Sequence, residues 1–150
     1  MIFRRKKKSL AVFIDGPNLL RKEFNIDLGK VKKRLEKFGR IVIAKVFLNQ
    51  FAPEKLIEAI TNQGFEPVVI MSKEKGRDEE SDVDVAMAVE ATEAIFNPNI
   101  DVIVIGTRDA DFIPLVRKIK AKGKEAVVLA VNSAFSVGLR NVADKVVLVK

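Results

Sequence analysis

The 150-residue sequence contains no cysteine, no histidine, no tyrosine and no tryptophan. A chain without cysteine and histidine has no thiol nucleophile, no imidazole base and no thiolate or imidazole ligand for zinc. Cysteine proteases, thiol redox enzymes and Ser-His-Asp hydrolases are therefore excluded. Any chemistry has to come from carboxylates, lysine, arginine, amides, hydroxyls and the backbone.

Long apolar runs are also absent. No segment approaches the ~20 apolar residues that would cross a bilayer. The run Leu10–Ile14 follows a basic stretch, as in a signal peptide, but it ends at Asp15 and is too short for a secretory leader, so we interpret it as a strand. The length and the 48% hydrophobic content are typical of one globular domain. We expect a cytoplasmic protein that does not bind membranes.

Positive charge is concentrated at the start of the chain. The net charge of +7 results from 27 Lys and Arg residues against 20 Asp and Glu residues, and five of the cations are Arg4, Arg5, Lys6, Lys7 and Lys8. Without these five, 22 cations face 20 carboxylates. We therefore predict a basic arm over residues 1–9 and a single domain over residues 10–150. The arm either binds a polyanion through its phosphates or is a solvated terminus.

Short β-branched runs alternate along the chain with stretches of helical period. Strands are predicted at Leu10–Asp15, Ile41–Leu48, Pro67–Met71, Val102–Gly106, Ala126–Val131 and Val146–Val149. Helices are predicted at 28–38 behind an Asp27 cap, from Pro53 to Gly64, at Ser81–Phe96, at 112–119 and at Ser136–Val142, with Ser72–Glu80 as a charged loop. The pattern indicates a three-layer α/β/α, doubly wound domain with a mainly parallel sheet of five to six strands in the order 3-2-1-4-5.

The common nucleotide fingerprints of such sheets are missing. Gly16-Pro17-Asn18 stands where a dinucleotide-binding G-x-G-x-x-G would follow the first strand, and no G-x-x-x-x-G-K-[ST] or G-x-S-x-G occurs. An aspartyl phosphatase would need an acid where Pro17 stands. Dehydrogenase, P-loop, phosphatase and α/β-hydrolase functions are therefore excluded.

Four aspartates are expected at the carboxyl edge of the sheet. Asp15 ends the first strand, Asp109 and Asp111 follow the fourth, and Asp84 lies in the first turn of the helix after the third. Strands one and four are neighbours in the predicted order, so these acids would meet at the point where the topology reverses. Helical period places Asp84 on a small-residue face directed inward and Asp82 on a stripe of acids directed to solvent.

Gathering carboxylates has a cost that a cation can offset. Two carboxylates ~4 Å apart repel by about 4 kcal/mol at an effective dielectric constant near 20. Hard oxygen ligands without histidine or cysteine suit Mg²⁺ or Mn²⁺, and the bound ion would then replace the missing histidine base. The alternative is a plain salt bridge to Arg108.

Three stretches resemble the motifs of the NYN domain family of PIN-like ribonucleases. They are FIDGPNLL (Phe13–Leu20), SDVDVAMAVEA (Ser81–Ala91) and GTRDADFIPLV (Gly106–Val116). The resemblance implies a PIN-like fold and Mg²⁺- or Mn²⁺-dependent hydrolysis of RNA phosphodiester bonds. It assigns metal-binding, catalytic carboxylates to Asp15, Asp84, Asp109 and Asp111, with Asn18 as a polar partner. We expect Asn18, Thr107, Arg108 and the arm cations to contact the RNA.

Two other functions stay open. A non-catalytic RNA-binding or protein-interaction module with the same fold is favoured by the near-neutral body and by Ser81-Asp82, where many family members carry Lys-Gly. A Toprim-like phosphoryl-transfer domain would share Asp109-x-Asp111, but it needs a glutamate after the first strand, and none follows Asp15 directly. The expected partner is RNA, and a homodimer is left open.

Overall fold

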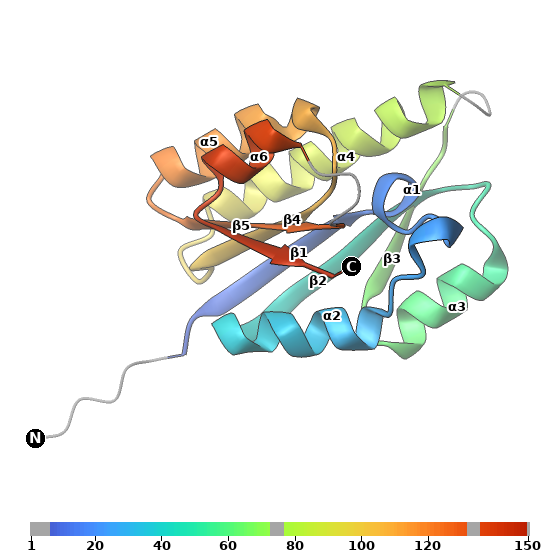
Figure 1. Ribbon diagram of the computed structural model, residues 1–150, viewed down its shortest axis with the longest axis horizontal. Helices are drawn as coiled ribbons and strands as arrows, with labels where there is room; N and C mark the ends of the chain where they lie inside the picture. The colour runs from blue at the N-terminus through green and yellow to red at the C-terminus, as the bar shows by residue number, and fades with distance from the viewer. Residues whose placement is uncertain (1–6, 73–76, 132–135, 150) are drawn as a thin grey trace, which may run out of the picture.

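Six strands form one sheet in which every pair of neighbours runs parallel. A computed structural model describes residues 7–72, 77–131 and 136–149, without the side chains of Glu23 and residues 77–81. The strands are β1 (Ser9–Asp15), β2 (Arg40–Asn49), β3 (Glu66–Ile70), β4 (Val102–Gly106), β5 (Glu125–Ala130) and β6 (Lys145–Leu148). Their order is β3-β2-β1-β4-β5-β6 (Figure 1). The predicted doubly wound order is confirmed, with β6 added beyond β5.

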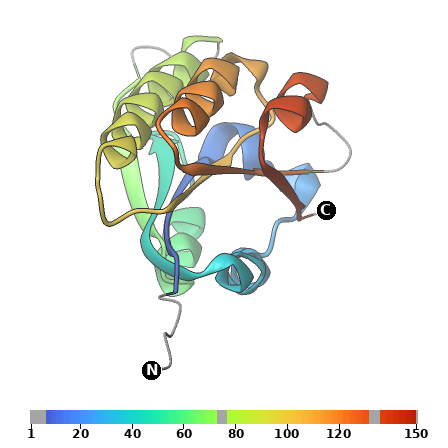
Figure 2. The same ribbon diagram turned by 90° about the vertical axis from the view of Figure 1, so that its left-hand side faces the viewer.

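Helices cover both faces of this sheet. The helices are α1 (Gly16–Leu19), α2 (Leu28–Leu35), α3 (Glu54–Asn62), α4 (Arg77–Ile95), α5 (Ile113–Ala121) and α6 (Val137–Val142), with 3₁₀ turns η1 (Lys22–Phe24), η2 (Glu36–Phe38) and η3 (Ala110–Phe112). Figure 2 shows α4, α5 and α6 on one face and α2 and α3 on the other. The three-layer architecture predicted from the alternation of strands and helices is therefore present.

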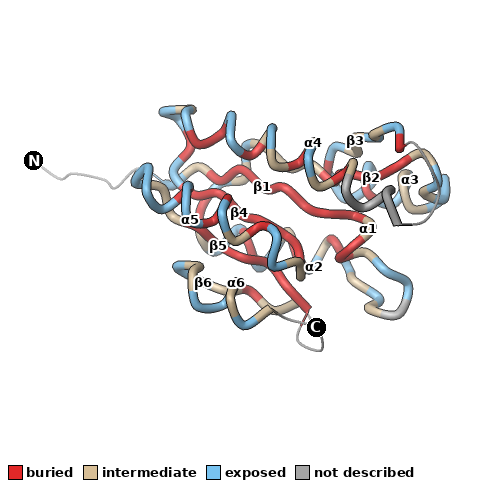
Figure 3. Tube along the Cα trace, turned by 90° about the horizontal axis from the view of Figure 1, so that it is seen from above, coloured by how far each residue is buried: buried red, intermediate tan, exposed pale blue. Residues whose placement is uncertain are grey.

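The central strands are buried on both faces, which explains their continuous apolar runs. Successive residues of a strand point to opposite faces, so Ala11 and Phe13 of β1 join the core under α4 and α5. Leu10, Val12 and Ile14 join the second core, under α2 and α3. Figure 3 shows β1 and β4 buried along most of their length. Substituting a fully buried residue such as Phe13 by alanine would cost about 3–5 kcal/mol.

Local sequence signals set several helix ends. The Asp27 carboxylate accepts hydrogen bonds from the backbone N–H groups of Gly29 (2.9 Å) and Lys30 (3.3 Å), so Asp27 is the N-cap that its position predicts. Gly64 and Gly123 have positive φ angles of 86° and 81° just after α3 and α5, a conformation that glycine adopts without strain.

The structure corrects two boundaries. α4 begins at Arg77, so residues 77–80, predicted as part of a charged loop, are helical, while 73–76 lie outside the described residues. No helix was predicted at residues 16–19, where the structure has α1. Among the described helices, none combines the length and the apolar content that a membrane crossing needs.

Candidate functional site

The buried polar side chains of the described chain all lie where strands end. They are Asp15, Asn18, Asn49, Ser72 and Thr107. The first four strands contribute one or two each, at or just after their last residues. Because all strands point the same way, these residues share the carboxyl edge of the sheet, where doubly wound domains bind ligands.

Asp15 and the residue after it shape the first turn at this edge. The Asp15 carboxylate accepts a hydrogen bond from Asn18 N–H (3.3 Å) and so caps α1. Gly16 packs so closely that a Cβ atom there would lie 2.5 Å from both the Phe47 carbonyl oxygen and the Leu48 Cδ2 atom. Only glycine fits this approach. Pro17 follows in the first turn of α1, and the helix places Asn18 one turn after the end of β1.

Asn18 joins the end of β1 to the loop after β4. Its Oδ1 atom accepts hydrogen bonds from Arg108 N–H (2.7 Å) and from the Thr107 hydroxyl (3.4 Å). The Thr107 hydroxyl also lies 3.5 Å from Asp15 Oδ2, and since it carries one proton it donates to one of these oxygens at a time. The same hydroxyl accepts from Asp109 N–H (3.1 Å), so Asp15, Asn18, Thr107 and Asp109 form one connected network.

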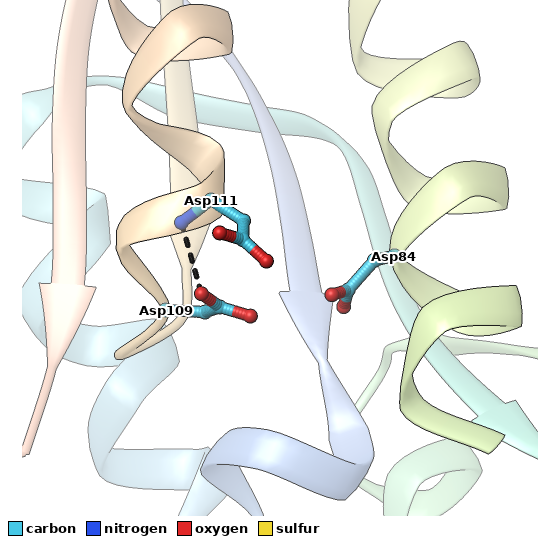
Figure 4. A group of neighbouring side chains, drawn as sticks. All are labelled: Asp84, Asp109 and Asp111. Atoms are coloured by element: carbon cyan, nitrogen blue, oxygen red, sulfur yellow. Dashed lines mark hydrogen bonds between the residues drawn. The ribbon is translucent and has the colours of Figure 1, made fainter. Parts of the chain in front are cut away.

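Three carboxylates converge above this network. Asp109 caps the turn η3, where it accepts from Asp111 N–H (2.9 Å), and Asp84 projects from α4. Oxygen atoms of Asp84, Asp109 and Asp111 all lie within 4.8 Å of one another. Figure 4 shows the three side chains pointing toward one another across the end of β1. Asp111 is exposed, whereas Asp84 and Asp109 are half-buried.

Asp15 lies outside this three-carboxylate group. It is 1% exposed and held by the hydrogen bonds to Asn18 and Thr107. The structure thus brings together three of the four aspartates predicted to bind metal and places the fourth, buried, at the end of the strand between them.

Arg108 is directed away from the acids. Its Nε atom donates to the Asn18 carbonyl oxygen (3.1 Å), and its guanidinium lies 4.9 Å from the centre of the Phe24 ring. Within the described part of the chain, no ion pair joins Arg108 to Asp109 or Asp111. A salt bridge to Arg108 therefore does not neutralise these two acids.

The prediction that Asp82 faces solvent is wrong. The buried face of α4 carries Val83 and Met87, and Asp82 flanks it half-buried, where it accepts a hydrogen bond from the Ser72 hydroxyl (3.0 Å). Glu90, on the same predicted solvent stripe, is also half-buried and pairs with Lys45 (2.8 Å). The hydrogen bond to Glu90 raises the pKa of Lys45. Burial lowers this pKa, but the charges of Glu90, Glu66 and Glu93 raise it further, and the net pKa is raised. The error came from interpreting the stripe that carries Asp82 and Glu90 as a solvent-facing surface because its residues are mostly acidic.

Three polar residues at the edge were not predicted as site residues, namely Asn49, Gln50 and Ser72. Gln50 exchanges two hydrogen bonds of 2.8 Å with the Ser72 backbone and so fastens the end of β2 to the chain after β3. Asn49 ends β2 and accepts from Phe51 N–H (2.8 Å). The signal that identified Asp15, a polar residue directly after an apolar strand, also marks Asn49.

The described part of the basic arm lies at the opposite edge of the sheet. Lys8 directly precedes β1 and pairs with Glu125 at the start of β5 (3.3 Å). β1 separates it from the acids by about 20 Å, at about 3.3 Å per residue. Arg4, Arg5 and Lys6 lie outside the described residues. The division at residue 9 and the RNA contacts of the arm stay predictions.

Comparison with known proteins identifies a family and several similar proteins. The model of the family described as "NYN domain" matches residues 9–150. An uncharacterised protein of Methanocaldococcus jannaschii is 53% identical over 144 residues, which are 96% of this chain and 56% of that protein. The chain thus spans about half the length of this relative. The crystal structure of a protein of unknown function from Vibrio parahaemolyticus superposes with a TM-score of 0.84 at 22% identity, over 99% of this chain and 97% of that one. This likeness shows the fold.

Proposed function

The chain belongs to the NYN domain family, and from this membership and the acidic site we propose that it is a ribonuclease that depends on Mg²⁺ or Mn²⁺. The family has a PIN-like nuclease fold, and its members are generally ribonucleases. The observation that carries the proposal is the convergence of Asp84, Asp109 and Asp111 at the edge where such sheets bind ligands.

The spacing of the three carboxylates fits one small divalent ion. Ligands of an octahedral Mg²⁺ at about 2.0–2.1 Å from the metal lie about 3–4 Å from one another. The oxygens of Asp84, Asp109 and Asp111 are within 4.8 Å of one another, so small side-chain rotations would close the distance. The donor set, oxygen only, is the set that Mg²⁺ and Mn²⁺ prefer.

When bound, the ion would activate water and offset the charge of the phosphate under attack. Asp84, Asp109 and Asp111 would hold it, and Asp15, buried at the end of β1, is the proposed fourth ligand. Asn18 and Thr107 keep the two strand ends in register through the hydrogen bonds described above. The Arg108 guanidinium, held by Asn18 and Phe24, would contact a neighbouring phosphate of the RNA.

The test is Asp109→Asn, measured by cleavage of mixed single-stranded RNA in the presence of Mn²⁺. Asparagine keeps the size of the side chain and caps a helix well, so the fold should survive. Cleavage should fall by orders of magnitude, while RNA affinity should be kept or rise because a negative charge facing phosphates is gone. Asp101→Asn is the matched control, because Asp101 precedes β4 at the opposite edge of the sheet, whereas Asp109 follows β4.

Equal cleavage by Asp109→Asn and the parent would remove the ribonuclease assignment. Metal-independent binding of RNA with no cleavage by either protein would favour the non-catalytic module.

A further inference from the structure

A groove of about 1370 Å³ lies between α2, α3 and the segment that follows α1. It is larger than the roughly 300–1,000 Å³ of most small-molecule pockets. The volume suits a length of polymer better than a single metabolite.

The rim of this groove is basic. Its cationic lining residues are Arg21, Lys22, Lys30, Arg34 and Lys55, and all five are exposed. Asp27 is the one carboxylate among the lining residues, and it is engaged in capping α2. For the described residues, no ion pair involves Lys22, Lys30 or Lys55. The rim therefore presents excess positive charge to whatever enters.

The floor of the groove is apolar. Ile26, Val31 and Leu56 line it together with other aliphatic residues of α2, α3 and β6. Arg34 donates a hydrogen bond to the Leu148 carbonyl oxygen and so ties α2 to β6 along the groove. A floor that accepts flat apolar faces under a rim that accepts negative charge matches a single-stranded nucleic acid, whose bases are exposed, better than a duplex, whose bases are paired.

The groove is continuous in sequence with the acidic site. Asp15 caps α1, and the residues just after α1 supply Arg21 and Lys22 to the rim. Phe24, in the same segment, lies under the Arg108 guanidinium. Figure 3 shows this segment looping out beside α1, with much of it exposed. A strand that passes the carboxylates and Arg108 would therefore meet the rim next.

We propose that this groove binds the single-stranded RNA on one side of the bond to be cut. The proposal rests on the proposed ribonuclease function for the position of that bond, but binding in the groove can be measured without cleavage. Phosphates would lie against the lysines and arginines of the rim, and bases would lie against the aliphatic floor.

The experiment is a salt titration of RNA binding in EDTA, followed by fluorescence anisotropy of a labelled single strand. The double variant Lys30→Gln/Lys55→Gln removes one cation from each side of the groove. It should weaken binding and flatten the slope of log affinity against log salt by about 1.4, at ~0.7 per single-strand contact. The control Arg117→Gln/Lys118→Gln removes two exposed cations from α5, on the other face of the sheet, and should leave the slope unchanged.

The outcomes separate the two proposals. A parent that binds RNA with the expected difference in slopes, yet never cleaves, would support the groove and reject the ribonuclease. Equal slopes in the groove and control variants would overturn the groove even if cleavage is strong, and so would a parent that does not bind RNA. Displacement of the RNA by polyglutamate as effectively as by unlabelled RNA of equal charge would assign the groove to an acidic protein partner.

Discussion

The two edges of the sheet handle negative charge in opposite ways. At the amino edge, Asp101 accepts a hydrogen bond from Ser9 N–H and Asp144 accepts one from Ala126 N–H, both at 2.8 Å. Glu125 lies there between Lys8 (3.3 Å) and Lys145 (3.0 Å). At the carboxyl edge, three carboxylates face one another instead.

This difference separates residues that hold the fold together from the residues proposed to bind a metal ion. A carboxylate beside an ammonium or N–H group lowers the free energy of the folded chain, whereas like charges within a few ångströms raise it. A protein that keeps such repulsion at the edge where ligands bind gains from it only when a cation arrives. The amino edge should therefore respond to mutation in stability, and the carboxyl edge in activity and metal response.

The largest expected effect distinguishes two aspartates of one helix. Asp84→Asn should lower Mn²⁺-dependent RNA cleavage by orders of magnitude, because it removes one member of the carboxylate group. Asp82→Asn should leave most of the activity, because Asp82 pairs with Ser72 outside that group. Single-turnover cleavage at saturating RNA measures both. Similar losses in the two variants would show that the group of three does not define the site.

The next largest effect concerns the thermal stability of the folded chain with bound metal. Metal at about a hundredfold above its dissociation constant should stabilise the folded chain by about 2.7 kcal/mol, which for a domain of this size raises Tm by about 5–10 °C. Calorimetry with and without Mn²⁺ measures this shift. Asp84→Asn should lose most of it, and Glu125→Gln at the other edge should keep it. If millimolar Mn²⁺ does not change the Tm of the parent, that result would contradict a preorganised metal site.

The smallest effect concerns Glu125 and pH. Burial raises the pKa of Glu125, but the hydrogen bonds and charges of Lys145 and Lys8 outweigh it, and the net pKa is lowered from 4.5. A lowered folded-state pKa gives stability that is complete above the unfolded pKa and is lost as pH falls through the folded value. Both lysines are more than half exposed, at 58% and 53%, so the gain is about 0.5–1 kcal/mol.

Glu125→Gln should therefore be less stable than the parent in urea unfolding at neutral pH, and the gap should narrow below about pH 4.5 as the parent carboxylate is protonated. A gap that stays constant into acid would show that the ion pairs contribute nothing and that packing causes the loss.

Sequence alone predicted the parts of the molecule that depend on periodicity. Strands with both faces buried had to be continuous apolar runs, and Val102–Gly106 has the predicted bounds. The placement of Asp109 and Asp111 at the carboxyl edge required only that the fourth strand be identified and that the sheet be parallel. The family resemblance, carried by three short motifs, is confirmed by the match over residues 9–150.

Features that depend on packing between distant segments were not predictable in this way. Gly16 lies against Phe47 and Leu48 of β2, about thirty residues away, and no local pattern encodes that contact. Asp82 is half-buried and accepts a hydrogen bond from the hydroxyl of Ser72, ten residues earlier. The groove is lined by residues of α2, α3, β6 and the segment after α1, and its cations are scattered along the sequence from Arg21 to Lys55.

The acidic site is assembled from a long helix and from a turn that follows the next strand, and this has a consequence for the lifetime of the folded chain. Asp84 meets Asp109 and Asp111 only when α4 has docked on the sheet and β4 has paired with β1. Partly ordered states in which either step is incomplete cannot present all three ligands. A metal held there would therefore lower the unfolding rate far more than it would raise the folding rate. In a cell with ample divalent cation, each folded molecule would then persist longer before it unfolds.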